Sequence, residues 1–185
     1  MEELEELVYK AINKDKKAFE ELIQYIRNDL YRVAQTRLEN IEDINDSIQN
    51  TLLTAYKSIK KLEKPQYFKT WIIKILINEC NKVYENNNKR IKLFQKMMNN
   101  KKAYAEDSSY IGKVEGKIEL EKIYKNLNYE EKICITLFYN SKYQVKEIAE
   151  ILNISPNTVK SRITRAKQKI KRYYDGGVEN ETARK

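Results

Sequence analysis

Apolar residues recur with the spacing of amphipathic α-helices along most of the chain. In the first half, this spacing predicts four helices, over about 1–12, 17–38, 43–59 and 67–84. We find no alternating apolar and polar run bounded by turn pairs, the pattern that predicts a strand. We therefore expect an all-α protein whose first four helices close one small core.

The helical spacing breaks once, between two regular parts. From Glu85 the sequence mixes asparagine runs, lysines and small polar residues, and regular spacing returns at Glu115. The pattern predicts two small helical domains, 1–90 and 115–174, joined by a flexible linker over 91–114. The polar tail, 175–185, is expected to be disordered.

The segment 143–172 has the pattern of a helix-turn-helix. Ala149 is small where the second helix must approach closely, and Asn153 stands where the turn needs a left-handed residue. Ser155 can cap the next helix, and Pro156 fits its first turn because no amide donor is needed there. These turn residues therefore predict two helices that pack against each other at a fixed angle.

The second helix of this motif has two unlike faces. Its apolar stripe consists of Val159, Ile163, Ala166 and Ile170. Its polar face consists of Asn157, Ser161, Thr164, Arg165 and Gln168. Lysines and arginines flank the polar face, and no acidic residue occurs over 156–172. Short polar side chains and arginine suit base edges in the DNA major groove, and the cations suit phosphates. The alternative to DNA binding is that this segment is a basic surface helix of an ordinary helical bundle.

A second candidate for nucleic-acid binding is the lysine-rich loop over 60–69. Its lysines lie beside Tyr67, Phe68 and Trp71, and cations next to aromatic rings suit a displaced single strand because every base can stack. Trp71 is in phase with apolar neighbours on its helix, which favours a place in the core over a base platform. The loop itself could also be a solvated turn.

Composition narrows the class of protein. The 185 residues carry a net charge of +9, which favours an anionic partner, and histidine is absent, which removes the commonest general base and metal ligand. Both cysteines lie in apolar runs and are expected to be buried free thiols of a reducing cytosol. Neither a signal peptide nor a membrane span is apparent in the sequence, so we expect a soluble cytoplasmic protein without cofactor or metal.

Three motifs in order resemble bacterial RNA polymerase sigma factors of the extracytoplasmic-function type, and the resemblance covers nearly the whole chain. DINDSIQNTLLTAYKSI over 43–59 and FKTWIIKILINEC over 68–80 resemble region 2, whereas EIAEILNISPNTVKSRITRAKQKIK over 147–171 resembles region 4. The region 4 pattern alone is shared with other helix-turn-helix regulators. The combination in this order is specific to the family.

The resemblance implies a role for three sets of residues. Region 4 would read the −35 promoter element through Ser155, Asn157, Thr158, Lys160, Ser161, Arg162 and Arg165. Region 2 would recognise and open the −10 element through Lys60, Lys61, Lys64, Tyr67, Phe68, Lys69, Trp71 and Asn78. Region 2 would also bind core polymerase through Asp43, Asp46, Gln49 and Asn50. The low charge of this last strip suits a protein contact, because interface centres are depleted in charge.

The implied partners are core RNA polymerase, duplex promoter DNA with its melted −10 strand, and an anti-sigma factor. One helix-turn-helix makes few base contacts, so tethering two readers on polymerase would raise the effective concentration of each. Two alternatives remain open. A freestanding regulator would bind a palindromic duplex without polymerase. A metal-dependent nuclease would need Glu42, Asp43 and Asp46 to bind Mg²⁺, but the sequence offers no histidine or glycine-rich phosphate loop to support it.

Overall fold

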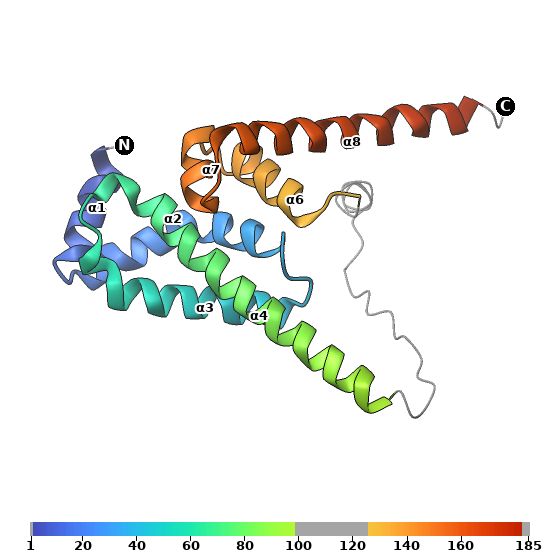
Figure 1. Cartoon of the computed structure of the whole chain (residues 1–185). Coiled ribbons are helices and arrows are strands. Elements are labelled where there is room, and N and C mark those ends of the chain that lie inside the picture. The colour runs from blue at the N-terminus through green and yellow to red at the C-terminus, as the bar shows by residue number, and fades with distance from the viewer. Residues whose placement is uncertain (1, 99–125, 183–185) are drawn as a thin grey trace.

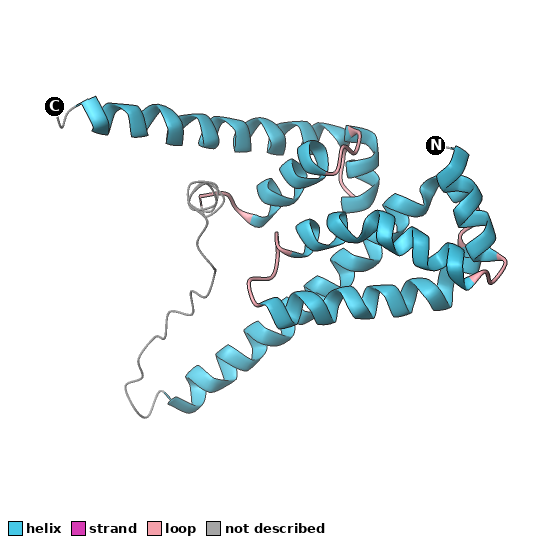
Figure 2. Cartoon of the chain, turned by 180° about the vertical axis from the view of Figure 1, so that it is seen from behind, coloured by secondary structure: helices cyan, strands magenta, loops and turns pink. Residues whose placement is uncertain are grey.

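The computed structural model describes residues 2–98 and 126–182, and every element in these two ranges is helical. In the first range, the elements are α1 (Glu2–Ile12), α2 (Lys16–Ala34), α3 (Ile41–Ser58), the short 3₁₀ helices η1 (Ile59–Lys61) and η2 (Pro65–Tyr67), and α4 (Phe68–Met98). In the second range, they are α6 (Tyr129–Ile135), the π-helical turn η3 (Thr136–Asn140), α7 (Val145–Leu152) and α8 (Pro156–Thr182). The predicted all-α, two-domain fold is confirmed (Figure 1, Figure 2).

Local capping fixes where the helices of the first domain begin. The Asp15 carboxylate accepts a hydrogen bond from the Lys17 amide at 2.9 Å, and the Asn40 side chain accepts one from the Glu42 amide at 2.7 Å. Helix α3 packs along α4, and α2 contacts both. The fully buried side chains of this core include Leu22 from α2, together with Ile72 and Leu76 from α4. These helices form the scaffold for the surfaces described below.

The second domain is held together by a polar contact as well as by apolar packing. Asn128 caps α6 in a reciprocal box with Glu131, whose carboxylate accepts a hydrogen bond from the Asn128 amide at 3.1 Å. The same carboxylate, only 4% exposed, pairs with Lys169 of α8 at 2.7 Å. This contact fixes the position of α8 against α6.

Two helices run further than the sequence pattern predicts. Helix α4 continues to Met98, so 91–98 is helical and the proposed linker does not begin at 91. Helix α8 continues to Thr182, so 175–182 is helical where disorder was expected. Once a helix is nucleated, each further residue adds one hydrogen bond and the helix can extend into solvent without an apolar stripe. The expected linker residues 99–114, the start of the second domain and the last three tail residues lie outside the described ranges.

The two domains contact each other directly. Helix α7 lies against α4 and η3 contacts α2, whereas the ends of α4 and α8 project away from the body (Figure 1). One continuous apolar cluster includes Phe68 and Ile72 of the first domain and Leu137 and Ile148 of the second. The sequence pattern predicted two tethered domains and gave no indication of this shared core.

No helix in the described ranges has the length and apolar character that a membrane span requires.

Candidate nucleic-acid and protein interfaces

The helix-turn-helix forms as its turn residues predict. Asn153 ends α7 in the left-handed conformation, at φ 52° and ψ 49°, and the Ile154 amide donates to the Ala149 carbonyl at 3.0 Å. The Ser155 hydroxyl accepts a hydrogen bond from the Thr158 amide at 3.1 Å and thereby caps α8. These contacts set the angle at which α8 leaves the turn.

Helix α8 packs its apolar stripe inward and exposes its polar face. Val159 and Ala166 are fully buried. Every member of the polar face is exposed: Asn157, Ser161, Thr164, Arg165 and Gln168. The Ser161 hydroxyl donates to the Thr158 carbonyl at 2.9 Å and accepts from Arg165 at 3.3 Å, so the guanidinium is aligned along the helix. The exposed face therefore carries donors and acceptors that base edges could meet.

The cations around α8 do not all point outward. Lys160 is exposed, as a phosphate contact requires. Arg162 is half-buried, and its charge lies near the Cys134 thiol of α6. Burial raises the pKa of that thiol, and the nearby Arg162 charge partly opposes the effect. Arg162 therefore exposes only part of its side chain, and its contact with DNA stays a prediction.

The basic loop between α3 and α4 exposes three lysines and one aromatic ring. Lys60, Lys61 and Lys64 are exposed, and Tyr67 at the end of η2 is 46% exposed. The Thr70 hydroxyl donates to the Tyr67 carbonyl at 2.9 Å and fixes the start of α4. The loop therefore offers cations beside an accessible aromatic ring, the combination that single-stranded nucleic acid favours.

Phe68 was grouped with these DNA-contacting residues, and that assignment is wrong for this structure. Its ring has no exposed surface and lies in the shared core, because the first turn of α4 points it inward. Trp71 is half-buried and packs against the core, with its ring centroid 6.2 Å from that of Phe68. The preference for Trp71 as a core residue agrees with this position, although one part of its surface stays accessible.

Lys69 and Asn78 flank the rest of this surface. The Lys69 ammonium lies 4.8 Å from the centre of the Tyr25 ring, within the range of a cation–π contact. Asn78 is exposed and lies two helical turns beyond Trp71, on the same face of α4. That spacing places Asn78 about 10 Å from Trp71 along the helix axis. Lys69 stands only two residues before Trp71 and so lies on the opposite side of α4. The predicted −10 residues are therefore spread over the loop and more than one side of α4.

Helix α3 exposes a low-charge strip. Asp46, Gln49 and Asn50 are all exposed and follow the helical spacing of one face. Leu53 continues that face one turn further and is 57% exposed. Asp43 is half-buried, and its carboxylate accepts a hydrogen bond from Asn87 of α4 at 2.8 Å. Asp43 therefore braces the two helices, whereas the other three residues are free to meet a partner.

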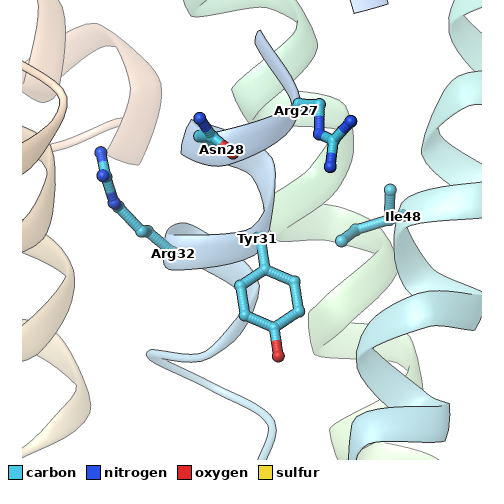
Figure 3. Close-up of a pocket in the computed structure, with 5 residues that line it drawn as sticks. All are labelled: Arg27, Asn28, Tyr31, Arg32 and Ile48. Atoms are coloured by element: carbon cyan, nitrogen blue, oxygen red, sulfur yellow. The ribbon is translucent and has the colours of Figure 1, made fainter. Parts of the chain in front are cut away.

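A shallow depression lies beside this strip, between α2 and α3. Arg27, Asn28, Tyr31 and Arg32 of α2 line it together with Ile48 of α3 (Figure 3). Arg32 is paired with Asp29 of its own helix at 3.8 Å. Within the described ranges, no three side chains of the metal-ligating types are grouped so as to hold an ion.

Two family models match the chain, and both describe parts of one family. Residues 22–90 match "Sigma-70 region 2" and residues 118–170 match "Sigma-70, region 4", which together cover most of the chain in the family's order. The chain belongs to the sigma-70 family. The first match covers the basic loop and the strip on α3, and the second covers the helix-turn-helix.

Curated relatives of this sigma-70 chain are full-length matches at low identity. It is 29% identical over 180 residues to the ECF RNA polymerase sigma-E factor of Haemophilus influenzae, covering 89% of this chain and 91% of that protein. It is 27% identical over 164 residues to the ECF sigma factor SigM of Bacillus subtilis, covering 88% and 98%. It is 23% identical over 180 residues to SigM of Mycobacterium tuberculosis, covering 94% and 87%. These relatives place the chain in the extracytoplasmic-function type.

Solved structures share the fold of this sigma-70 chain. CnrH in complex with the cytosolic domain of CnrY has a TM-score of 0.68 at 19% identity, covering 94% of this chain and 97% of that one. The sigma factor RpoE of Bartonella quintana, in complex with the anti-sigma factor NepR, has a TM-score of 0.68 at 21% identity, covering 86% and 98%. Both are two-domain helical proteins of the same architecture.

Sequence reasoning missed three residues that the structure makes prominent in this sigma-70 chain. Leu53 could have been found, because it lies four residues after Gln49 on the face already singled out. Arg37 and Tyr143 take part in contacts between the two domains. Their roles depend on how the domains pack together, which helical spacing does not encode.

Proposed function

We propose that this chain is a promoter-specificity subunit that binds core RNA polymerase in the cytoplasm and directs it to two promoter elements. The observation that carries the proposal is the presence, in one chain and in family order, of a region 2 and a region 4 that each expose a distinct interaction surface. Sigma factors of this family initiate transcription as DNA-binding subunits. The division of labour among the residues follows from the surfaces.

We propose that the polar face of α8 reads the −35 element. Asn157, Ser161 and Arg165 present short polar groups and one guanidinium, which can reach base edges while Lys160 meets a phosphate. The apolar stripe of α8 is packed in the core, so the backbone that carries the exposed polar face is held in a fixed position. Few base contacts in one helix imply modest affinity for DNA alone and a strong dependence on salt.

We propose that the basic loop and α4 hold the opened −10 element. Tyr67 replaces Phe68 as the main stacking platform, because Tyr67 is 46% exposed and Phe68 is fully buried. Lys60, Lys61 and Lys64 would neutralise the phosphates of the displaced strand. An unpaired base stacked on Tyr67 would then trap the open duplex, against an unstacking cost of roughly a few kcal/mol.

We propose that the strip of Asp46, Gln49, Asn50 and Leu53 binds core polymerase. Neutral polar side chains around one exposed leucine match the composition of protein interface centres. We also propose an anti-sigma partner, because the similar RpoE was solved in complex with the anti-sigma factor NepR.

The test is co-elution of the purified chain with bacterial core RNA polymerase in moderate salt, followed by transcription from a pool of promoters. We expect stable co-elution and new transcripts whose start sites share −35 and −10 sequences. If the chain does not co-elute but binds a palindromic duplex tightly without polymerase, it is a freestanding regulator and the proposal is wrong.

A further inference from the structure

The last part of α4 leaves the body of the protein. It is held to α3 at Asn87, whose side-chain amide donates a hydrogen bond to the Asp43 carboxylate at 2.8 Å. Beyond that contact, every residue from Lys89 to Phe94 is exposed, and the helix projects away from the rest of the molecule (Figure 1). Because α4 ends at Met98 and each residue adds about 1.5 Å, the projecting end is about 16 Å long. A surface on this end is therefore open to a partner.

The projecting end exposes three large apolar side chains close together. Ile91 is 54% exposed, Leu93 is 58% exposed and Phe94 is 63% exposed. Single exposed apolar residues are common on protein surfaces, but three within one helical turn form a patch on the order of 300 Å². Patches of this kind mark the places where a protein meets another molecule or a membrane. We therefore expect a partner to cover this part of α4.

Positive charge is interleaved with these apolar side chains. Lys89, Arg90 and Lys92 are all exposed, and no acidic residue occurs over 86–98. A second copy of this chain would bring a second set of the same cations against the first, and like charges repel. The partner must therefore offer negative charge together with apolar surface.

The positions of these residues around the helix decide which anionic partner fits. At about 100° per residue, the apolar side chains of Leu93, Phe94 and Ile91 span an arc of about 160°. Arg90 lies inside this arc and Lys89 lies just beyond its Leu93 edge. A single partner helix contacts a narrower stripe, so it would leave either Ile91 or Leu93 in water. Nucleic-acid phosphates would meet the cations but leave the apolar side chains uncovered.

An anionic lipid surface accommodates both features at once. Apolar side chains of an interfacial helix enter the boundary between headgroups and acyl chains. Lysine and arginine side chains are long enough to reach back from that depth to the lipid phosphates, which explains how Arg90 can stand inside the apolar arc. A bilayer is also flat and adaptable, so it can cover an arc wider than the stripe that a partner helix contacts.

We propose that residues 89–94 of α4 form a peripheral docking site for membrane surfaces that contain anionic lipid. The helix lies along the headgroups and does not span the bilayer, in keeping with its short apolar segment. Three half-exposed apolar side chains and three cations give reversible binding, so docked protein exchanges with protein in solution. The inference does not depend on the proposed function, because the residues proposed to contact polymerase and promoter lie outside 89–94.

The test is co-sedimentation of the full-length chain with vesicles of equimolar phosphatidylglycerol and phosphatidylcholine, and with vesicles of phosphatidylcholine alone. Ile91→Ser removes one apolar side chain of the site, and Ile41→Ser on α3 is its matched control because Ile41 is 52% exposed. A triple variant, Lys89→Gln/Arg90→Gln/Lys92→Gln, removes the charge of the site. Its control neutralises three exposed lysines near the start of α2, in the triple variant Lys14→Gln/Lys16→Gln/Lys17→Gln.

We expect the wild-type chain to sediment with the anionic vesicles, to bind the neutral vesicles much more weakly, and to be released by salt. Ile91→Ser should lower the partition coefficient about fivefold, because about half of the side chain is available for burial. Each cation near the anionic surface is worth about fivefold, so the triple variant of the site should lower the coefficient about 100-fold. Both controls should leave it nearly unchanged.

A second measurement separates insertion from attraction by charge alone. An environment-sensitive fluorophore is attached at Leu93→Cys, while the native cysteines are buried. Its emission should shift to the blue with anionic vesicles, because the label enters the acyl boundary. Binding without this shift, or an equal loss in the two triple variants, would show a general attraction of a basic protein to negative charge and would overturn the inference.

The other possible partners are tested with the same variants. If the chain stays in solution with both kinds of vesicle, the inference is wrong, and the remaining results show what covers the end of α4. Weaker binding of Ile91→Ser to a random DNA duplex would then assign the site to nucleic acid. A wild-type dimer that Ile91→Ser dissociates would assign it to a second copy of this chain.

Discussion

Leu53 offers the sharpest test of the proposed polymerase-binding strip on α3, because its contribution to binding can be calculated from its exposed fraction. Full burial of a leucine side chain is worth about 1.5–3 kcal/mol. Leu53 is already 43% buried, since it is 57% exposed, so a partner can remove only the remaining surface from water. That remainder is worth about 1–2 kcal/mol in a well-packed contact.

Leu53→Ala keeps the Cβ atom, so we expect a loss of about 1 kcal/mol, or about a fivefold rise in the Kd for core polymerase. The free energy of unfolding should change by less than about 0.5 kcal/mol, because more than half of the Leu53 side chain is already exposed to solvent in the free protein. The measurement is titration of labelled protein with core polymerase, alongside urea unfolding of each variant. Unfolding data are needed to separate a lost contact from a weakened fold.

The chain supplies a matched control in Leu93, near the projecting end of α4. It is 58% exposed, so Leu93→Ala removes the same atoms with the same starting exposure. We expect it to leave the Kd for polymerase unchanged. If Leu93→Ala weakened binding as much as Leu53→Ala, or if Leu53→Ala had no effect, the assignment of the α3 strip would be refuted.

Three further predictions concern the DNA-reading helix, the ion pair and the buried thiol. Lys160→Ala should weaken promoter binding by the polymerase complex and reduce the slope of log K against log salt by about 1, whereas Asp46→Ala should leave that slope unchanged. The measurement is promoter binding over a series of salt concentrations. An unaltered slope in the lysine variant would count against a phosphate contact. Lys169→Met leaves the Glu131 carboxylate buried without its cation, so urea unfolding should show a loss of about 3 kcal/mol. The double variant Lys169→Met/Glu131→Gln should lose less than the sum of the two single variants, and a loss equal to that sum would mean that the pair is not coupled. Burial raises the pKa of Cys80 from 9.0 to about 11. At pH 8 the thiolate fraction of Cys80 should therefore be about 100-fold below that of an ordinary thiol, and its alkylation rate should be lower by the same factor. Unfolding in urea should restore the ordinary rate. Because the unfolded thiol ionises first, folding stability should fall as pH rises from about 9 through about 11, and a flat profile there would contradict the shift.

The helices and the turn were predictable from sequence because local chemistry determines them. Asn153 and Ser155 fulfil in the structure the roles that their side chains favour in isolation, a left-handed cap and an N-cap. Both cysteines are buried free thiols, as their apolar surroundings indicate. The ends of α4 and α8 were placed too early, because polar sequence without an apolar stripe can still propagate a helix that has already begun.

Individual site residues were harder to assign, because position in a motif does not fix the direction of a side chain. Phe68 and Tyr67 are adjacent and both aromatic, yet one is fully buried and the other half-exposed. Arg162 matches the region 4 pattern as well as Lys160 does, but Arg162 is half-buried and Lys160 is exposed. A motif identifies the helix that is proposed to meet DNA. The packing behind that helix decides which of its cations are free.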